Sequence, residues 1–593
     1  MGSETRTASG TESPSGNGSP LSSLFAAVID RAAEARRGLS LLHQARLFDP
    51  LRPDRSLRFG LDSRRLGPMT ASLRGAVDRH PDAVGLIDER GELTYAELDA
   101  RSDALATAWR ADGIADRAVI GLLCRDHRGL FDVLFAAAKS GARLLLLNTG
   151  FAGPQLADVV KREGVQVVVY DEEFEDVVTQ LPDDVVRFLA WTEDEAAAAP
   201  YPRIEELITD TAPGRLPQPS EVGTLVLLTS GTTGVPKGAP RQVKGPKFVV
   251  QLLDRVPWQP GERTLISSPL FHATGLAHAG LAVSLGSAIV VQRRFDALGA
   301  VRTLAEHRCT GMVLVPTMLH RMVALGPKTL AEYDLSRVRI MLSAGAPLAP
   351  ALVHGALDAF GDVLYNLYGS TEVALATVAQ PHELRASPTT AGRPLVGCDV
   401  GLYDEEGHRL TGADRRGRVF VGNGMKFGGY TDGRTKQEID GLMSTGDMGH
   451  FDTSGLLFLD GRDDDMVLCG GENVFPGEVE NLLWTHEDIT EAAVIGVDHP
   501  EFGTRLAAFV VLAPGAELTE EDVREHVRSH LARHKVPAQV LFVDELPRNP
   551  TGKLLRGAAR EVALRESRAA PGEEQGQGQG EGQEQEPDGG GAR

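Results

Sequence analysis

The stretch that decides the fold is LLTSGTTGVPKG, which runs from Leu227 to Gly238. The apolar run Thr224–Leu228 leads into it, and a helical pattern that ends near Arg255 follows it. A strand, a loop of Gly, Ser and Thr, and a helix together offer backbone N–H groups and hydroxyls to a phosphate. Lys237 adds a positive charge. Because the GxxxxGK[ST] pattern of a Walker A loop is absent, the sequence predicts a phosphate loop of another kind.

Around this loop, strand-like and helix-like segments alternate. The strand-like runs are Ala118–Cys124, Arg143–Asn148, Val165–Tyr170, Ala288–Gln292, Met312–Pro316, Arg339–Ser343 and Val363–Tyr368. Apolar strands about 25 residues apart, with helices between them, predict βαβ units and buried parallel sheet. After about residue 396, shorter strands with Gly turns predict a small antiparallel or barrel-like subdomain. A last α/β stretch runs from about residue 465 to residue 564.

The composition excludes several classes of protein. The 593 residues include 61 Lys+Arg and 82 Asp+Glu, which gives a net charge of −21. A general nucleic-acid binder needs a basic face, so this class is disfavoured. The four cysteines are far apart, which argues against disulfides and a zinc site and predicts a cytoplasmic protein. No run has the length and flanks of a membrane span, and the N-terminus does not read as a signal peptide.

The two ends differ from the body in composition. We expect a disordered Ser/Gly/Thr-rich leader at 1–20 and a disordered acidic tail at 566–593. Between them we expect an N-terminal helical extension at 21–66, a large domain at 67–460, a hinge at 461–465 and a C-terminal lid domain at 466–565. Residues 21–48 combine helical apolar spacing with basic residues. A helix packed on the body is the preferred interpretation, and peripheral contact with a membrane is the alternative.

Further motifs follow the phosphate loop in a fixed order. They are PLFHATG (269–275), SAGAPL (343–348), NLYGSTE (366–372), STGDMG (444–449), GRDDDMVLCGGENVFPGEVE (461–480) and NPTGKLLR (549–556). With TSGTTGVPKG they make the chain resemble the adenylate-forming superfamily of acyl-CoA synthetases, aryl-acid ligases, luciferases and adenylation domains. The resemblance covers about residues 73–560. It implies an α/β fold, in which a large domain of parallel-sheet subdomains and a small β-barrel precedes a smaller, mobile α+β domain.

The resemblance also implies a set of ATP-binding residues. These are Thr229, Ser230, Gly231, Thr232, Thr233, Gly234, Lys237, Gly345, Ala346, Asn366, Tyr368, Gly369, Ser370, Thr371, Glu372, Asp447, Arg462 and Lys553. Within this set Tyr368 and Asn366 are expected at adenine and Asp447 at the ribose. Glu372 and Thr229 are expected to hold Mg²⁺, since both offer hard oxygen ligands.

Four residues are implied to act directly in the chemistry: Lys553, Thr371, Lys237 and His272. The cation of Lys553 would stabilise negative charge that develops at the α-phosphate. His272 is expected at the carboxylate end of the acyl pocket. By the same resemblance Asp464 is the hinge about which the lid domain rotates. Gly470 and Gly471 would lie beside the channel for the pantetheine arm of CoA, where small residues are expected.

The sequence thus predicts an AMP-forming ligase that joins a medium- or long-chain fatty acid to CoA, with ATP, Mg²⁺ and CoA as cofactor and co-substrates. The segment Phe271-His272-Ala273 lacks the Asp that anchors an amino-acid substrate in relatives, which favours a plain carboxylic acid. An aryl-acid–CoA ligase, transfer of the acyl group to a carrier protein, and a non-catalytic binding protein stay open as alternatives. The oligomeric state is also open, with a homodimer as one candidate.

Overall fold

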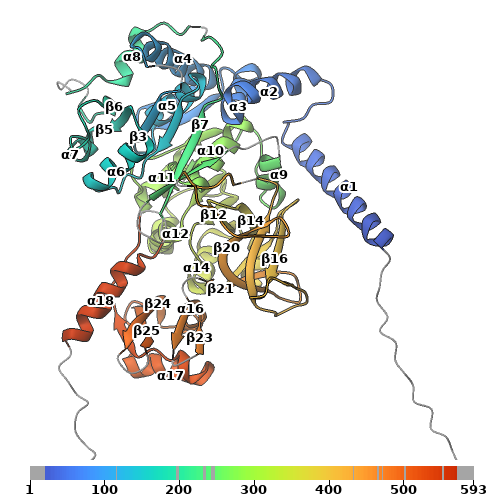
Figure 1. The fold of residues 1–593 in the computed structure, drawn as a ribbon, viewed down its shortest axis with the longest axis vertical. Coiled ribbons are helices and arrows are strands. Elements are labelled where there is room, and N and C mark those ends of the chain that lie inside the picture. Colours follow the sequence, from blue (N-terminus) through green and yellow to red (C-terminus); the bar gives the residue numbers. More distant parts are fainter. Residues whose placement is uncertain are drawn as a thin grey trace, which may run out of the picture.

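The structure is a computed structural model that describes residues 20–114, 117–194, 200–214, 216–230, 236–241, 247–425, 427–431, 433–463, 466–469, 472–499, 503–549 and 553–569. Two large sheets with helices on them form the body, and a smaller domain lies beside them at the C-terminal end (Figure 1). The predicted fold class is confirmed.

The first sheet has six strands in the order β6-β5-β3-β4-β7-β8. Its members are β3 (Val119–Leu123), β4 (Arg143–Leu146), β5 (Val167–Asp171), β6 (Val186–Trp191), β7 (Thr224–Ser230) and β8 (Pro236–Arg241). All neighbours are parallel except β7 and β8, which are antiparallel. β5 is buried at all five positions, as expected for a parallel strand covered on both faces.

The second sheet has fifteen strands, and their pairing changes from mainly parallel to antiparallel along the sheet. Its parallel part contains β1 (Val84–Asp88), β9 (Arg263–Ile266), β10 (Ala288–Val290), β11 (Gly311–Leu314), β12 (Ile340–Ala344) and β13 (Leu364–Ser370), and β2 (Gly91–Thr94) pairs antiparallel with β1. Its antiparallel part contains β14 (Ala374–Ala379), β15 (Thr390–Pro394), β16 (Asp399–Tyr403), β17 (Arg409–Leu410), β18 (Gly417–Gly422), β19 (Glu438–Ile439), β20 (Leu442–Phe451) and β21 (Leu457–Arg462). The strands expected as a small barrel therefore continue the main sheet through β14 and β15.

Helices cover these sheets. They are α3 (Pro68–Arg79), α4 (Tyr95–Ala111), α5 (Arg128–Lys139), α6 (Gly153–Glu163), α7 (Glu175–Val178), α8 (Ile204–Asp210), α9 (Lys247–Asp254), α10 (Ala273–Ser284), α11 (Ala297–Glu306), α12 (Pro316–Val323), α13 (Gly326–Leu330), α14 (Pro350–Phe360) and α15 (Pro381–Ala386). Local sequence explains some of the boundaries. α4 begins with a capping box in which Thr94 and Glu97 exchange hydrogen bonds, and Gly164 ends α6 in the left-handed region.

The C-terminal domain is a small sheet with helices. It contains β22 (Val467–Cys469), β23 (Glu472–Val474), β24 (Ile489–His499), β25 (Gly503–Leu512), β26 (Gln539–Phe542), α16 (Pro476–Leu483), α17 (Glu520–His530) and α18 (Arg556–Ala569). Ala349 and Leu352, at the start of α14, pack against its apolar core. The ion pair between Arg416 and Glu478 adds a polar contact to the body. The lid domain is therefore docked on the large domain.

Two further helices precede α3 at the N-terminal end of the chain. α1 (Pro20–Gln44) extends away from the body, and α2 (Pro53–Leu66) lies beside α3 (Figure 1). The second half of α1 contacts α9, because Arg37 Nε lies 2.5 Å from Asp254 Oδ1 and Ala45 is buried. At the other end of the chain, α18 continues to Ala569, four residues beyond the expected end of the lid domain.

Candidate functional site

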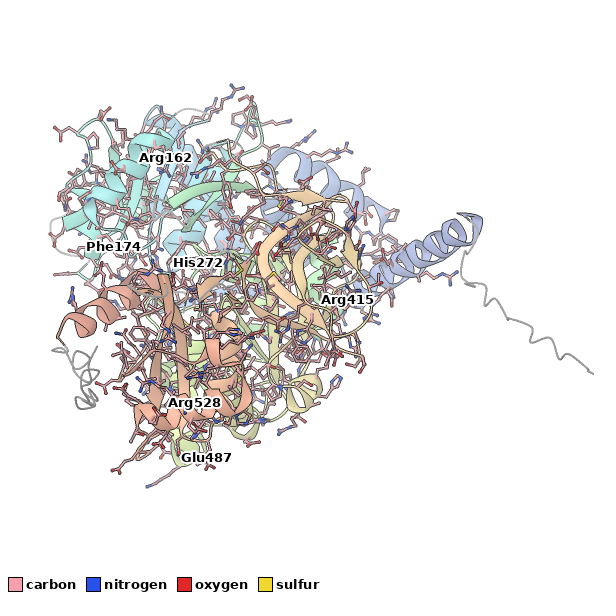
Figure 2. All side chains as sticks on the ribbon, turned by 60° about the horizontal axis from the view of Figure 1, so that its bottom comes forward. Arg162, Phe174, His272, Arg415, Glu487 and Arg528 are labelled. Carbon is pink, nitrogen blue, oxygen red and sulfur yellow. The ribbon has the colours of Figure 1, made fainter. Side chains whose placement is uncertain are left out.

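One large cavity lies where the two body sheets and the C-terminal domain meet. Its volume is about 2550 Å³. Figure 2 shows His272 near the centre of the molecule, whereas Arg528 and Glu487 mark the outer surface of the C-terminal domain. The cavity brings together predicted residues from six motifs: His272, Gly345, Ala346, Asn366, Tyr368, Gly369, Ser370, Thr371, Glu372, Asp447, Arg462 and Lys553.

Most of the predicted phosphate-loop, hinge and channel residues lie outside the part of the chain that the structure describes. Gly231, Thr232, Thr233, Gly234, Asp464, Gly470 and Gly471 lie outside the described residues. For Thr229, Ser230 and Lys237 only the backbone is described. Thr229 is the register partner of Lys237 across β7 and β8, so the two ends of the phosphate loop are held side by side.

The end of β13 supplies the centre of the site. Tyr368, Gly369 and Ser370 close this strand at the carboxyl edge of the parallel sheet, where ligands of α/β folds usually bind. A Cβ at Gly369 would overlap the carbonyl oxygen of Ala374, so only glycine fits at this position. Asn366 Nδ2 donates to Thr390 O over 3.3 Å, which leaves its side-chain carbonyl oxygen as the acceptor for an adenine amino group.

Glu372 is held as an ionised carboxylate. Tyr430 Oη donates to its Oε1 over 2.6 Å, and Ser370 Oγ donates to its Oε2 over 2.9 Å. Burial disfavours the charged form, but these hydrogen bonds and the ammonium of Lys436 hold the pKa of Glu372 below its ordinary value. An ionised carboxylate at this edge suits Mg²⁺, which prefers oxygen ligands.

Asp447 lies opposite Arg462 in the register of β20 and β21. Arg462 Nη1 is 3.4 Å from Asp447 Oδ1, and Tyr368 Oη donates to Asp447 Oδ2 over 2.5 Å. Burial raises the pKa of Asp447, while Arg462, Tyr368 and Lys553 act in the opposite direction. A carboxylate has about four acceptor sites, so Asp447 can still accept from ribose beside Arg462, Tyr368 and Thr445.

His272 caps the N-terminal end of α10 and lies in the cavity. Burial, together with the charge of Lys553, lowers its pKa to about 3, so the imidazole is neutral at ordinary pH. Its Nε2 is buried and has no hydrogen-bond partner among the residues that the structure describes. The ring is packed against Phe271, with 4.5 Å between centroids. A neutral imidazole here can form one hydrogen bond with a substrate group through Nε2.

Lys553 reaches the site from the C-terminal domain. Asn549 N donates to Lys553 O, and Lys553 N donates to Asn549 Oδ1, both over 2.9 Å, so this turn is fixed at its base. The ammonium acts electrostatically on both His272 and Asp447. The structure thus has the lid arrangement in which Lys553 faces the cavity.

Some cavity residues were not predicted from the sequence. They are Tyr430, Arg434, Thr435 and Lys436 from the segment before β19, and Arg548 from the C-terminal domain. The scarcity of lysine was one available signal, because Lys436 is one of only ten lysines in the chain. Thr431 N donates to Gly238 O over 2.9 Å, so the segment that carries Tyr430 is hydrogen-bonded to the base of the phosphate loop.

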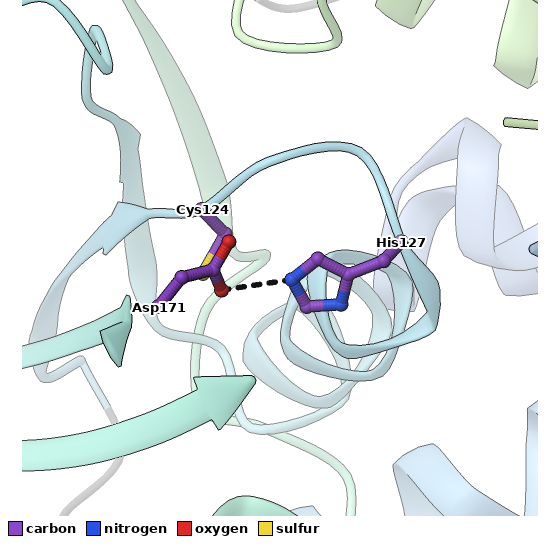
Figure 3. A group of neighbouring side chains, drawn as sticks. All are labelled: Cys124, His127 and Asp171. Carbon is purple, nitrogen blue, oxygen red and sulfur yellow. Dashed lines mark hydrogen bonds and ion pairs between the residues drawn. The ribbon is translucent and has the colours of Figure 1, made fainter. Parts of the chain in front are cut away.

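A second group of reactive side chains lies away from this cavity. Among the described residues, Cys124, His127 and Asp171 are buried and bring their ligand atoms within 4.8 Å of one another (Figure 3). His127 Nδ1 accepts from Gly129 N over 3.0 Å, so Nε2 carries the proton and donates to Asp171 Oδ1 over 2.8 Å. Arg125 N donates to the other carboxylate oxygen.

The thiol of Cys124 completes this network. Burial, with the nearby carboxylate, raises its pKa well above the ordinary value, so the sulfur stays protonated. Its Sγ lies 3.7 Å from Val169 O. Because the polar atoms of the group have protein partners, the network ties β3, β5 and the start of α5 together and needs no metal.

Comparison with known proteins identifies the family. A family model described as AMP-binding enzyme matches residues 73–431, and the AMP-binding enzyme C-terminal domain matches residues 478–553. The chain belongs to the AMP-binding enzyme family. The resemblance to the adenylate-forming superfamily is confirmed, and within it this AMP-binding enzyme falls among the acid–CoA ligases.

Individual relatives cover most of this AMP-binding enzyme. The fatty acid–[acyl-carrier-protein] ligase ScoC of Streptomyces coeruleorubidus is 31% identical over 81% of this chain and 93% of its own length. The indoleacetate–CoA ligase of Aromatoleum aromaticum is 31% identical over 83% and 98%. Among solved structures, the amide bond synthetase McbA of Marinactinospora thermotolerans has a TM-score of 0.73 and 26% identity, with 84% of this chain and all of that chain covered. Within the described residues, no helix has the length and apolar character needed to cross a membrane.

Proposed function

We propose that this AMP-binding enzyme activates a medium- or long-chain fatty acid to acyl-AMP and then joins it to CoA. The observation that carries the choice of acid is the extent of the cavity. Its volume of about 2550 Å³ includes the space around the nucleotide residues and beside the C-terminal domain, so the choice depends on the part that lies beyond them. The space beyond the nucleotide residues continues along α10 toward α3 and α2.

The α10 side of this extension is largely apolar, although Thr274, His278 and Ser284 of α10 also line the cavity. Ala273, Leu276, Ala277, Gly280 and Leu281 line it from one face of α10. Met69 faces them from α3, since its sulfur is 4.0 Å from a Cβ built on Gly280. The apolar stretch of wall beside α10 supports an alkyl chain, and the neutral His272 at the N-terminal end of α10 supports a carboxylate that is about to react.

In the first step the carboxylate attacks the α-phosphate of ATP and pyrophosphate leaves. In this proposal Lys553 stabilises the charge that develops between the two groups, and Thr371 donates a hydrogen bond to phosphate. Glu372 has the ionised oxygen ligands for Mg²⁺, which would neutralise phosphate charge when bound. Lys237 joins this set through its position at the base of the phosphate loop.

In the second step the CoA thiol attacks the acyl carbonyl and AMP leaves. Lys553 occupies the site in the present arrangement, so we propose that the lid domain rotates about Asp464 before this step. Gly470 and Gly471 would then border the pantetheine channel. These three residues lie outside the described residues, and their roles rest on the family resemblance. A cytoplasmic location also remains part of the proposal.

The identity of the acceptor has a direct test. ScoC is named as a ligase for an acyl carrier protein, whereas the indoleacetate enzyme is named as a CoA ligase. Purified enzyme with ATP, Mg²⁺, dodecanoate and free CoA, without any carrier, is expected to give dodecanoyl-CoA. Formation of dodecanoyl-AMP with no thioester would favour transfer to a carrier protein instead.

An aryl acid is the second candidate, supported by the similarity to the indoleacetate–CoA ligase. An aromatic acid would fill only the inner part of the cavity. Pyrophosphate release with indoleacetate and benzoate, measured beside a series of fatty acids, separates these substrate classes.

The role of Lys553 is tested by separating the half-reactions. Lys553→Ala is expected to reduce acyl-AMP formation by about 100-fold or more, as for loss of a transition-state contact. Thioester formation from supplied acyl-AMP should stay within a few-fold of wild type, because Lys553 has left the site by then. Equal loss in both half-reactions would contradict the assigned role.

A further inference from the structure

Exposed apolar side chains gather at the N-terminal extension. Half of the twelve large apolar side chains that are exposed among the described residues lie between residues 39 and 61. Leu51 is 86% exposed and Leu57 is 66% exposed. Single exposed leucines are normal, but a group of them on one short segment indicates a surface that is covered in use.

The outward side of α2 carries two of these residues. Leu57 and Leu61 are four positions apart and therefore lie on the same side of the helix. Leu66, the one buried residue of α2, faces the body. Leu51 directly precedes the helix. We define the α2 outer face as Leu51, Leu57, Leu61 and Arg65, which are all exposed. Arg58 and Arg64 are also exposed, but they border this face and line the cavity.

The charge of this extension is opposite to that of the chain. Residues 21–66 contain nine arginines and five acidic residues, in a protein of net charge −21. Arg64 and Arg65 have no acidic partner within 4.0 Å among the described residues, and Arg58 has only a 3.6 Å contact with the exposed Asp78. Unpaired arginines beside exposed leucines are the composition of a helix that lies on an anionic membrane surface.

The same helix borders the cavity. Arg55, Phe59 and Ser63 of α2 line the cavity, and His272 lines the same continuous space. The family match begins at residue 73, so α2 lies outside the domain that the family model describes. An added helix whose residues line the cavity is well placed to control how an acid enters.

We propose that the α2 outer face docks on an anionic lipid bilayer and brings this end of the cavity to the membrane, from which a fatty acid enters. The leucines would insert at the boundary of headgroups and acyl chains, while the arginines contact lipid phosphates. The route of the acid rests on the proposed function. The docking itself does not rest on the proposed function, because it depends only on the exposed residues of the α2 outer face.

Vesicle sedimentation tests the docking. The full chain is mixed with vesicles of phosphatidylglycerol and phosphatidylcholine, or of phosphatidylcholine alone, and the bound fraction is measured against lipid concentration. Wild type should bind the anionic vesicles and lose most of this binding in 0.5 M KCl, as expected when charge attraction contributes. Leu57→Ser/Leu61→Ser should bind about tenfold more weakly. Arg64→Gln/Arg65→Gln should lose about fivefold for each arginine.

Val186→Ser is the matched control, because Val186 is 46% exposed on β6 and is outside the α2 outer face. It should bind vesicles as wild type does. Equal binding to neutral and anionic vesicles, or unchanged binding of both double variants, would overturn the proposal. A wild-type dimer that the leucine double variant converts to monomer would also overturn it, since a second copy would then cover this face.

The kinetics separate docking from the proposed function. With soluble hexanoate as the acid, the leucine double variant should retain wild-type pyrophosphate release. With palmitate supplied in anionic vesicles, its rate should fall in proportion to lost binding. If no fatty acid is a substrate, the vesicle result still stands and only the entry route fails.

Discussion

The hydroxyl of Tyr368 lies 2.5 Å from Oδ2 of Asp447, and this hydrogen bond joins the two halves of the second sheet. Tyr368 comes from β13 at the edge of the parallel part, and Asp447 comes from β20 in the antiparallel part. Burial, with the adjacent carboxylate, raises the pKa of Tyr368 well above its ordinary value, so the hydroxyl stays a donor. The acceptor expected at the ribose is therefore positioned by the residue expected at adenine.

Tyr368→Phe tests this link, because it removes the donor and leaves the ring in place. A hydrogen bond to a charged group contributes about 1.5–3 kcal/mol, so kcat/KM for ATP should fall by about 10- to 100-fold. Pyrophosphate release at varied ATP concentration measures this. An unchanged kcat/KM for ATP would show that Asp447 does not depend on Tyr368.

Tyr430→Phe tests the proposed metal site. The variant removes the hydrogen bond to Glu372 Oε1, so the pKa of Glu372 should rise and its affinity for a cation should fall. We expect the Mg²⁺ concentration for half-maximal activity to increase by about tenfold. Tyr403→Phe is the control, since Tyr403 makes a similar hydrogen bond to Asp440 away from the cavity. An equal Mg²⁺ requirement in both variants would contradict the role of Glu372.

The motif residues were predictable because each lies in a short, ordered segment with a recognisable pattern. Tyr430 could not be found in this way. It is 58 residues from Glu372 along the chain, and only the fold brings their side chains together. Arg548 was missed for the same reason, since its place at the cavity depends on how the lid domain docks.

The alternation of apolar runs predicted the parallel strands, because strands buried on both faces are apolar throughout. It did not predict that β13 pairs antiparallel with β14 and so joins the parallel part to the expected barrel. Strand pairing depends on neighbours that are distant in sequence. The sequence also did not predict which side of α2 is exposed, because helical periodicity does not show which side of a helix packs against the body.

Asp126 predicts a pH dependence of stability. Burial raises its pKa to about 7, while Leu270 N, which donates to Oδ1 over 3.1 Å, and the charge of Arg125 act in the opposite direction. A folded-state pKa above the ordinary 3.8 means that the folded protein holds a proton that the unfolded chain has lost. The contribution to stability is full below about pH 4 and is lost as the pH rises to about 7.

Asp126→Asn should remove this dependence, because the amide oxygen still accepts from Leu270 N and carries no charge. Between pH 5 and pH 8, wild type should lose about 3 kcal/mol more of its unfolding free energy than the variant. Urea unfolding at both pH values measures the difference. Equal losses would show that Asp126 is ionised throughout this range.

The central claim is that the cavity along α10 holds a long alkyl chain, and Gly280 provides the most direct measurement. A Cβ built there has only Met69 Sδ, at 4.0 Å, in contact, so Gly280→Phe should place its ring in the space along α10. Pyrophosphate release is measured for wild type and variant with acids from four to sixteen carbons and with indoleacetate. We predict that wild type prefers medium and long chains. The variant should lose at least about tenfold in kcat/KM for these and keep its activity on the shortest acids. A wild type that prefers indoleacetate, or a variant with an unchanged chain-length profile, would contradict the account.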